Sequence, residues 1–123
     1  MQTTVKSFKD LKVWKSSYQL ALAIYEITKN FPKEEIYGLV SQMRRSSVSV
    51  PSNIAEGYSR KGRPEYVRFL SIAYGSLSEL ETQILLSKDL KYIDEEKFNN
   101  LMQLKDETGG MLYKLMQKLE SFN

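Results

Sequence analysis

Hydrophobic residues recur at spacings of three and four along the first part of the chain, the period of an α-helix with a buried face. They form two neighbouring stripes, which are Leu11, Trp14, Tyr18, Ala21 and Tyr25 in the first and Val13, Leu20, Ile24, Ile27 and Phe31 in the second. Together the stripes make a wider apolar face than one antiparallel partner helix covers. The pattern predicts a helix from about Asp10 to Phe31, with Asp10 or Ser7 as its N-cap and Pro32 beyond its end.

The same periodicity predicts a second and a third helix. The second is expected to run from Glu34 or Glu35, which suit the positive end of a helix dipole, to about Arg60. The third is expected to run from Pro64, a residue favoured at the first helical position, to about Leu90. Its inward residues are predicted to be Phe69, Ala73, Leu77, Leu80 and Ile84.

A fourth helix is predicted to begin after Asp94, a suitable N-cap, and to extend close to Phe122. Its apolar stripe resembles a heptad seam and contains Phe98, Leu101, Thr108, Leu112, Leu115, Leu119 and Phe122. Gly109 and Gly110 interrupt the stripe, which favours a local weak point or a close helix contact over a functional hinge. Four long amphipathic segments with short connections predict an all-α fold, an up-down-up-down antiparallel four-helix bundle, as a single domain over residues 1–123.

The expected second helix contains an unusually polar stretch, "SSVSVPSNIAEG", over residues 46–57. Pro51 removes a backbone hydrogen bond to Ser47, which predicts a kink in this helix. Small and polar residues line one side of two helices, namely Gln42, Ser46, Ser49, Asn53 and Glu56 on the second and Gly75, Ser76, Glu79 and Gln83 on the third. We interpret them as a hydrogen-bonded polar layer, because a buried polar group without a partner costs about 1–3 kcal/mol. The alternatives are a ligand or catalytic site on Glu56 and Glu79, or a groove that faces solvent or another subunit.

Composition argues against an enzyme. The chain contains no histidine and no cysteine, so it lacks the commonest general base, a thiolate nucleophile and the commonest metal ligands. Its carboxylates are scattered, and Glu79 and Glu81 stand two residues apart and therefore point to different helix faces. We expect no catalytic residue, no metal and no cofactor. With no signal-peptide pattern and no apolar run of about 18 residues, we expect a cytoplasmic protein that does not enter a membrane.

Basic residues cluster around the expected turn between the second and third helices. Arg60, Lys61, Arg63 and Arg68 stand near one acid, Glu65, which makes a local net charge of +3. Two further groups are Arg44 with Arg45, and the series Lys6, Lys9, Lys12 and Lys15. Such residues bind phosphate backbones without reading the base sequence, and Tyr58 and Tyr66 beside the turn are candidates for stacking on unpaired bases. The alternative is that the charges are an ordinary solvated surface and the tyrosines pack within the bundle.

Three stretches resemble a known family. "FKDLKVW", "FPKEEIYGLVSQMRRSSVSVPSNIAEGYSR" and "FLSIAYGSLSELETQILLS" are similar to the bacterial four-helix-bundle family of the 23S ribosomal RNA intervening-sequence protein. The resemblance implies a bundle that assembles as a ring, with five subunits as the expected number. It also implies kinship with the accessory variability protein of diversity-generating retroelements, a basic ring that works with nucleic acid and a reverse transcriptase. The family name records where such genes were noticed and defines no biochemical activity.

These observations lead to one functional prediction and one alternative. We expect a non-enzymatic homo-oligomer, a pentamer, that binds RNA or DNA through a basic surface without sequence-specific readout. The wide apolar face of the first helix independently favours self-association, since a soluble monomer rarely exposes so large a patch. The expected partners are further copies of the chain, RNA or DNA, and a nucleic-acid-processing protein. The alternative is a protein-protein interaction scaffold with no nucleic-acid role.

Overall fold

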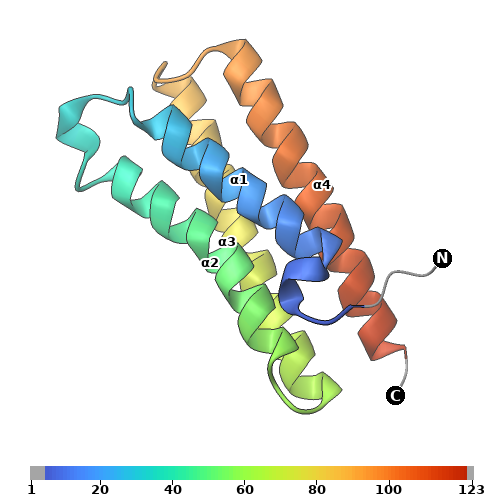
Figure 1. Cartoon of the computed structure of the whole chain (residues 1–123). Coiled ribbons are helices and arrows are strands. Elements are labelled where there is room, and N and C mark those ends of the chain that lie inside the picture. The colour runs from blue at the N-terminus through green and yellow to red at the C-terminus, as the bar shows by residue number, and fades with distance from the viewer. Residues whose placement is uncertain (1–4, 122–123) are drawn as a thin grey trace.

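Four α-helices run alternately up and down in the computed structural model, which describes residues 5–121 (Figure 1). They are α1 (Lys12–Thr28), α2 (Leu39–Tyr58), α3 (Arg63–Asp89) and α4 (Glu95–Glu120). Two short 3-10 helices precede the first two, η1 (Phe8–Asp10) and η2 (Lys33–Glu35). Each helix packs antiparallel to the next, and α4 returns beside α1. The predicted all-α, up-down-up-down bundle is confirmed.

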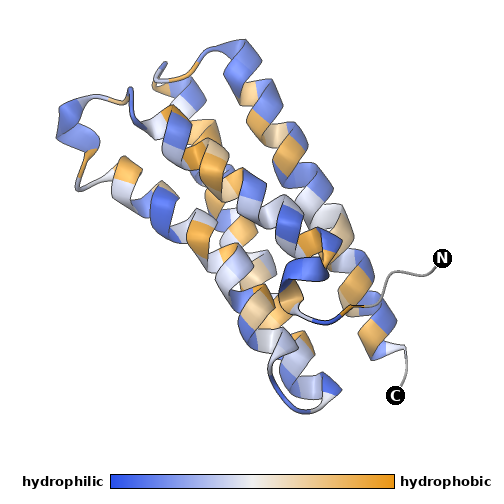
Figure 2. Cartoon of the chain, in the orientation of Figure 1, coloured by the Kyte–Doolittle hydropathy of each residue, from blue (hydrophilic) through white to orange (hydrophobic). Residues whose placement is uncertain are grey.

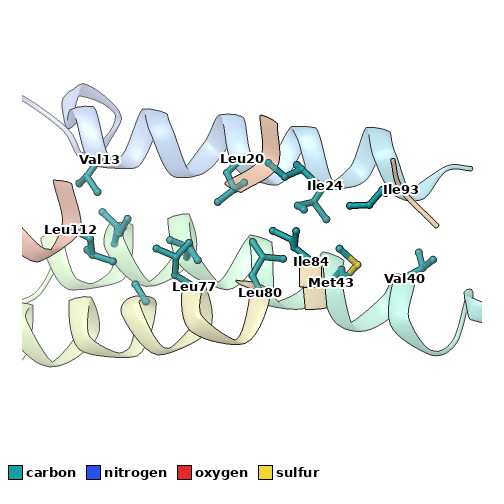
Figure 3. Close-up of a cluster of buried hydrophobic side chains, with 14 of the residues drawn as sticks. Val13, Leu20, Ile24, Val40, Met43, Leu77, Leu80, Ile84, Ile93 and Leu112 are labelled. Atoms are coloured by element: carbon teal, nitrogen blue, oxygen red, sulfur yellow. The ribbon is translucent and has the colours of Figure 1, made fainter. Parts of the chain in front are cut away.

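The core lies along the bundle axis and receives side chains from all four helices (Figure 3). On α1 the second predicted stripe supplies the buried residues Val13, Leu20 and Ile24. On α3 and α4 the predicted stripes are largely correct, because Ala73, Leu77, Leu80, Ile84, Leu101, Thr108 and Leu112 are buried. Phe69 is only half-buried, and its neighbour Leu70 takes the interior position. Hydrophilic and hydrophobic residues alternate along each helix (Figure 2).

The start of the first helix differs from the prediction. Ser7 and Asp10, the two expected caps, form a reciprocal capping pair around η1, and α1 begins only at Lys12. The Ser7 hydroxyl accepts a hydrogen bond from the Lys9 amide at 3.0 Å, and the Asp10 carboxylate accepts one from the Ser7 amide at 3.2 Å. Leu11 is extended, with a ψ of 129°, and this separates the two helices. The predicted helix was therefore too long at this end, because the capping signal belonged to a separate short turn.

The first helix also ends early, at Thr28, and the second begins late, at Leu39. Glu34 and Glu35 lie in η2 and not in the first turn of α2, which corrects the predicted start. Glu35 nevertheless caps α2, because its carboxylate accepts a hydrogen bond from the Leu39 amide at 3.1 Å.

The remaining boundaries are close to those predicted. Pro64 occupies the second position of α3, after Gly62 with a φ of 87°, and the Asp94 carboxylate caps α4 through the Lys97 amide at 2.9 Å. Pro51 is buried inside α2, and the helix continues through it to Tyr58. At Gly109 an added Cβ would lie 3.3 Å from the Leu77 side chain, so a close helix contact explains this glycine. Phe122, the predicted last residue of the α4 stripe, lies outside the described residues.

Candidate nucleic-acid interface

Hydrogen bonds between helices show which residues lie at the same height in the bundle. Ser16 of α1 meets Thr108 of α4, with their hydroxyl oxygens 2.7 Å apart, and Ser49 of α2 meets Ser76 of α3 at 2.8 Å. Because neighbouring helices are antiparallel, residues 5–16, 56–69 and 108–121 occupy the same end of the bundle, and Figure 1 shows this arrangement. We call these three segments the turn end, since they include the α2–α3 turn.

Positive charge is concentrated at the turn end. Ten basic residues lie there, all with exposed side chains, namely Lys6, Lys9, Lys12, Lys15, Arg60, Lys61, Arg63, Arg68, Lys114 and Lys118. The acids of the same segments are Asp10, Glu56, Glu65 and Glu120. Ten cations against four anions make a formal net charge of +6, whereas the remaining 8 basic and 11 acidic residues of the chain make −3. The overall charge of +3 therefore conceals a polarised molecule.

Ion pairs hold two of the turn arginines. Arg60 lies 3.0 Å from the Glu56 carboxylate, and Arg68 lies 3.6 Å from that of Glu65. Both guanidinium groups also lie over the ring of Phe69, at 5.0 and 5.6 Å from its centroid. The cluster predicted from the sequence is thus partly neutralised, and Lys61 and Arg63 add exposed positive charge beside it.

The two tyrosines beside the turn pack against each other. The rings of Tyr58 and Tyr66 meet edge to face with centroids 6.2 Å apart, and both side chains are half-buried. Burial, with a smaller contribution from Tyr58, raises the pKa of Tyr66 to about 12. This geometry favours the packing interpretation over free stacking platforms for bases, since each ring already has a partner.

The structure places Arg44 and Arg45, which we predicted as a further basic group, away from the turn cluster. They lie near the other end of α2, about 20 Å along the helix axis from Tyr58, its last residue, given the rise per residue of an α-helix. The structure does bring the predicted N-terminal lysine series to the turn end, together with Lys114 and Lys118, which sequence reasoning missed. The missed signal was topological, because the last turns of the fourth helix in such a bundle lie beside the start of the first.

The polar layer between α2 and α3 is smaller than the stripe from which it was predicted. The buried Ser46 hydroxyl donates to the amide oxygen of the buried Gln83 at 2.6 Å. Half-buried Asn53 donates from Nδ2 to the backbone oxygen of Ser49 at 2.8 Å, and the Ser49 hydroxyl meets that of Ser76. Every buried side-chain nitrogen and oxygen in residues 5–121 has a hydrogen-bond partner.

Three predicted members of this layer are exposed, namely Gln42, Glu56 and Glu79. Their assignment to a buried layer was wrong, because Gln42 and Glu56 lie at the solvent-facing ends of the α2 stripe and Glu79 faces solvent on α3. Glu56 instead pairs with Arg60, and the Glu79 carboxylate lies 3.5 Å from the Gln83 side-chain nitrogen. Nowhere in the described part of the chain do three or more metal-ligating side chains gather.

The first apolar stripe of α1 is partly exposed, as expected for a face wider than one partner helix covers. Tyr18 and Tyr25 are 45% and 40% exposed, and the neighbouring Leu22 is 50% exposed. With Trp14, which stacks on Tyr18 at a centroid distance of 4.9 Å, they line a shallow groove of about 390 Å³ against α2. The second stripe occupies the bundle interior, so the first stripe is left on the surface. Within residues 5–121, no helix combines the length and apolar character required to cross a bilayer.

Comparisons with known proteins agree on the fold. The model of a family described as the 23S rRNA-intervening sequence protein matches residues 9–114. No curated protein matches the chain. A crystal structure from Bacteroides thetaiotaomicron, described as a protein of unknown function from the S23 ribosomal protein family, is similar with a TM-score of 0.77 and 23% sequence identity. The match covers 85% of this chain and 95% of that one.

Proposed function

The chain belongs to the 23S rRNA-intervening sequence protein family, and we propose that it is a non-enzymatic, self-associating bundle that binds the phosphate backbone of RNA or DNA. The observation that supports nucleic-acid binding is the charge polarity. The turn end holds a formal charge of +6 on exposed side chains from three separate segments, and the rest of the chain holds −3. A surface of this kind binds a polyanion by releasing its condensed counterions.

The contacts within the turn end suit phosphate better than base recognition. The Arg60–Glu56 and Arg68–Glu65 pairs are exposed, and such pairs contribute at most about 1 kcal/mol each, so a phosphate can replace the carboxylate. Phe69 meanwhile keeps both guanidinium groups in place at the surface. The half-buried Tyr58 and Tyr66 beside this turn pack edge to face against each other, so each ring already has an aromatic partner. We therefore propose binding without sequence-specific readout.

Self-association is the second part of the proposal. The exposed stripe of Tyr18, Leu22 and Tyr25 is apolar, continuous along α1 and adjacent to a groove against α2. Burying such a stripe against another copy removes its apolar surface from water. We propose a closed ring, with five copies as the number that the sequence resemblance implies, in which the turn ends combine into one positive surface. The same stripe is also the observation that favours the alternative, a scaffold that binds other proteins.

The decisive experiment is a titration of labelled single-stranded RNA and duplex DNA at several salt concentrations. For the wild type, log affinity should fall linearly with log salt, with a slope of about −0.7 to −0.9 per phosphate contacted. Lys15→Glu with Lys61→Glu should weaken binding and flatten this slope. Lys91→Glu with Lys97→Glu is the matched control, because it changes the net charge equally at exposed positions away from the turn end.

Either of two results would contradict nucleic-acid binding at the turn end. If both double variants lose affinity equally, or if the wild type does not bind, the charge polarity has no role in nucleic-acid binding and the scaffold becomes the better explanation.

Light scattering coupled to size exclusion tests the assembly, and a monomeric mass at micromolar concentration would refute the ring. Both variants should keep the wild-type mass, because neither changes the apolar stripe.

A further inference from the structure

A second cationic site lies near the opposite end of the bundle from the turn end. It is a cavity of about 740 Å³ between the end of α1, the loop that contains η2, and the beginning of α2. In Figure 1 this loop projects beyond the ends of the two helices. Four cations line the cavity, Lys29, Lys33, Arg44 and Arg45, and among the described residues no carboxylate does.

Arg44 is held in place by contacts with α1. Its Nε donates to the Thr28 hydroxyl at 3.0 Å and its Nη2 donates to the backbone oxygen of Tyr25 at 3.4 Å. The guanidinium also lies over the Tyr25 ring, 4.7 Å from its centroid. Thr28 is itself fixed, since its hydroxyl donates to the backbone oxygen of Ile24 at 2.7 Å. The Arg44 head is therefore oriented before any ligand arrives.

The orientation of Arg44 leaves it without an anion. Its side chain is half-buried, and within residues 5–121 it forms no ion pair with a carboxylate. A guanidinium has five N–H donors and two of them are used here, so three remain. Lys33 and Arg45 add further positive charge, while Lys29 pairs with Glu26 at 3.0 Å. A partly desolvated charge with unused donors, next to these cations, is a suitable binding site for a phosphate group.

An aromatic ring stands at the edge of the same cavity. Tyr37 is 97% exposed, although the loop that holds it is anchored on both sides. The Glu35 carboxylate accepts hydrogen bonds from the Leu39 amide at 3.1 Å and from the Tyr92 hydroxyl at 2.8 Å. The loop is thus tied to α2 and to the α3–α4 connection, and the exposed ring is a platform on which an unpaired base can stack.

We propose that this cavity binds a nucleotide, with its phosphate on Arg44 and Arg45 and its base on Tyr37. The ligand is either a free nucleotide or one unstacked nucleotide of a single strand, because both present the same phosphate and base. This inference does not rest on the proposed function of the turn end, since the two sites share no residue.

The test is calorimetric titration of the full chain with a ribonucleoside monophosphate, a short single-stranded oligonucleotide, the matching nucleoside and inorganic phosphate. Tyr37→Ser should weaken nucleotide binding by about 5- to 150-fold, the loss expected when one base no longer stacks, and should leave phosphate binding unchanged. Arg45→Glu should weaken binding of nucleotide and phosphate alike. Both positions are exposed, so circular dichroism should show an unchanged fold.

Two controls separate this site from the turn end. Lys97→Glu makes the same charge change as a single substitution outside the cavity and should leave nucleotide binding unchanged. Lys15→Glu with Lys61→Glu should also retain nucleotide binding, even where the turn end no longer binds the phosphate backbone of RNA or DNA. Binding of the monophosphate identifies a free nucleotide as a ligand, and binding of the oligonucleotide alone identifies a strand. No binding, or nucleotide binding that Tyr37→Ser and Arg45→Glu leave intact, would overturn the inference.

Discussion

At Gly57, α2 and α3 approach each other so closely that a side chain would disturb their contact. A Cβ added there would lie 2.9 Å from the Cβ of Phe69, 3.1 Å from Cδ1 of Tyr66 and 3.2 Å from the Tyr66 backbone oxygen. Two of these atoms, the Phe69 Cβ and the Tyr66 oxygen, belong to or adjoin the α3 backbone, so they cannot move aside alone. Gly57→Ala must therefore push the two helices apart next to the Tyr58–Tyr66 contact.

Two opposing effects determine the free energy of unfolding of this variant. Alanine favours the helical backbone over glycine by up to about 1 kcal/mol. Overpacking of a well-packed contact costs about 1–3 kcal/mol. The expected result is a net destabilisation of about 1 kcal/mol. Gly75 and Gly110 provide matched controls, because both lie inside helices and an added Cβ meets no atom within 4 Å. Alanine at either should stabilise the protein by about 0.5–1 kcal/mol.

The assay is urea unfolding followed by circular dichroism at one fixed protein concentration. Because the two effects have opposite signs, the free energies of unfolding of Gly57→Ala and of the control variants should differ by about 2 kcal/mol. For a urea m-value of about 1–3 kcal/mol/M, the urea concentrations at their unfolding midpoints should differ by about 1 M. If Gly57→Ala is as stable as Gly75→Ala, the close approach of α2 and α3 at Gly57 does not exist in solution. The steric argument would then be refuted, whatever the absolute stability of the protein.

Two further predictions concern the polar layer and the turn. Ser46→Ala removes the 2.6 Å donor to the buried Gln83 oxygen and should lower the free energy of unfolding by about 1–3 kcal/mol, whereas the exposed Ser78→Ala should change it by less than about 0.5 kcal/mol. Equal urea midpoints for the two variants would contradict this role of Gln83. An unfolded tyrosine ionises near pH 10, whereas Tyr66 keeps its proton to about pH 12, so wild-type stability should be full below pH 10 and fall as the pH rises from 10 to 12. Tyr66→Phe should reduce this alkaline decline in thermal unfolding, with a remainder from Tyr92, whose pKa the hydrogen bond to Glu35 also raises. An unchanged decline would show that Tyr66 does not contribute to it.

Local pattern was sufficient for much of the fold. The apolar periodicity predicted all four helices, and the bounds of α3 and the Asp94 cap of α4 were close to those observed. Signals of this kind act over a few neighbouring residues, so they can be recognised in the sequence alone. The errors occur at η1 and η2, two short turns that no long apolar stripe indicates. Ser7 caps η1, and Glu35 lies in η2 while its carboxylate caps α2.

The sequence alone determined the all-α class, the helix order and the presence of positive charge. These properties depend on the apolar periodicity, on capping and helix-breaking residues, and on composition. Only the tertiary structure decided where the charge lies, since the antiparallel topology brings Lys6 and Lys118, far apart in the chain, to the same end. It likewise decided that Arg44 of α2 reaches across to Thr28 of α1 and lines a cavity with no carboxylate among the described residues. The Arg60–Glu56 pair joins residues four apart, which a sequence pattern can suggest. The Arg44–Thr28 contact joins two separate helices, and a one-dimensional pattern does not encode such a contact.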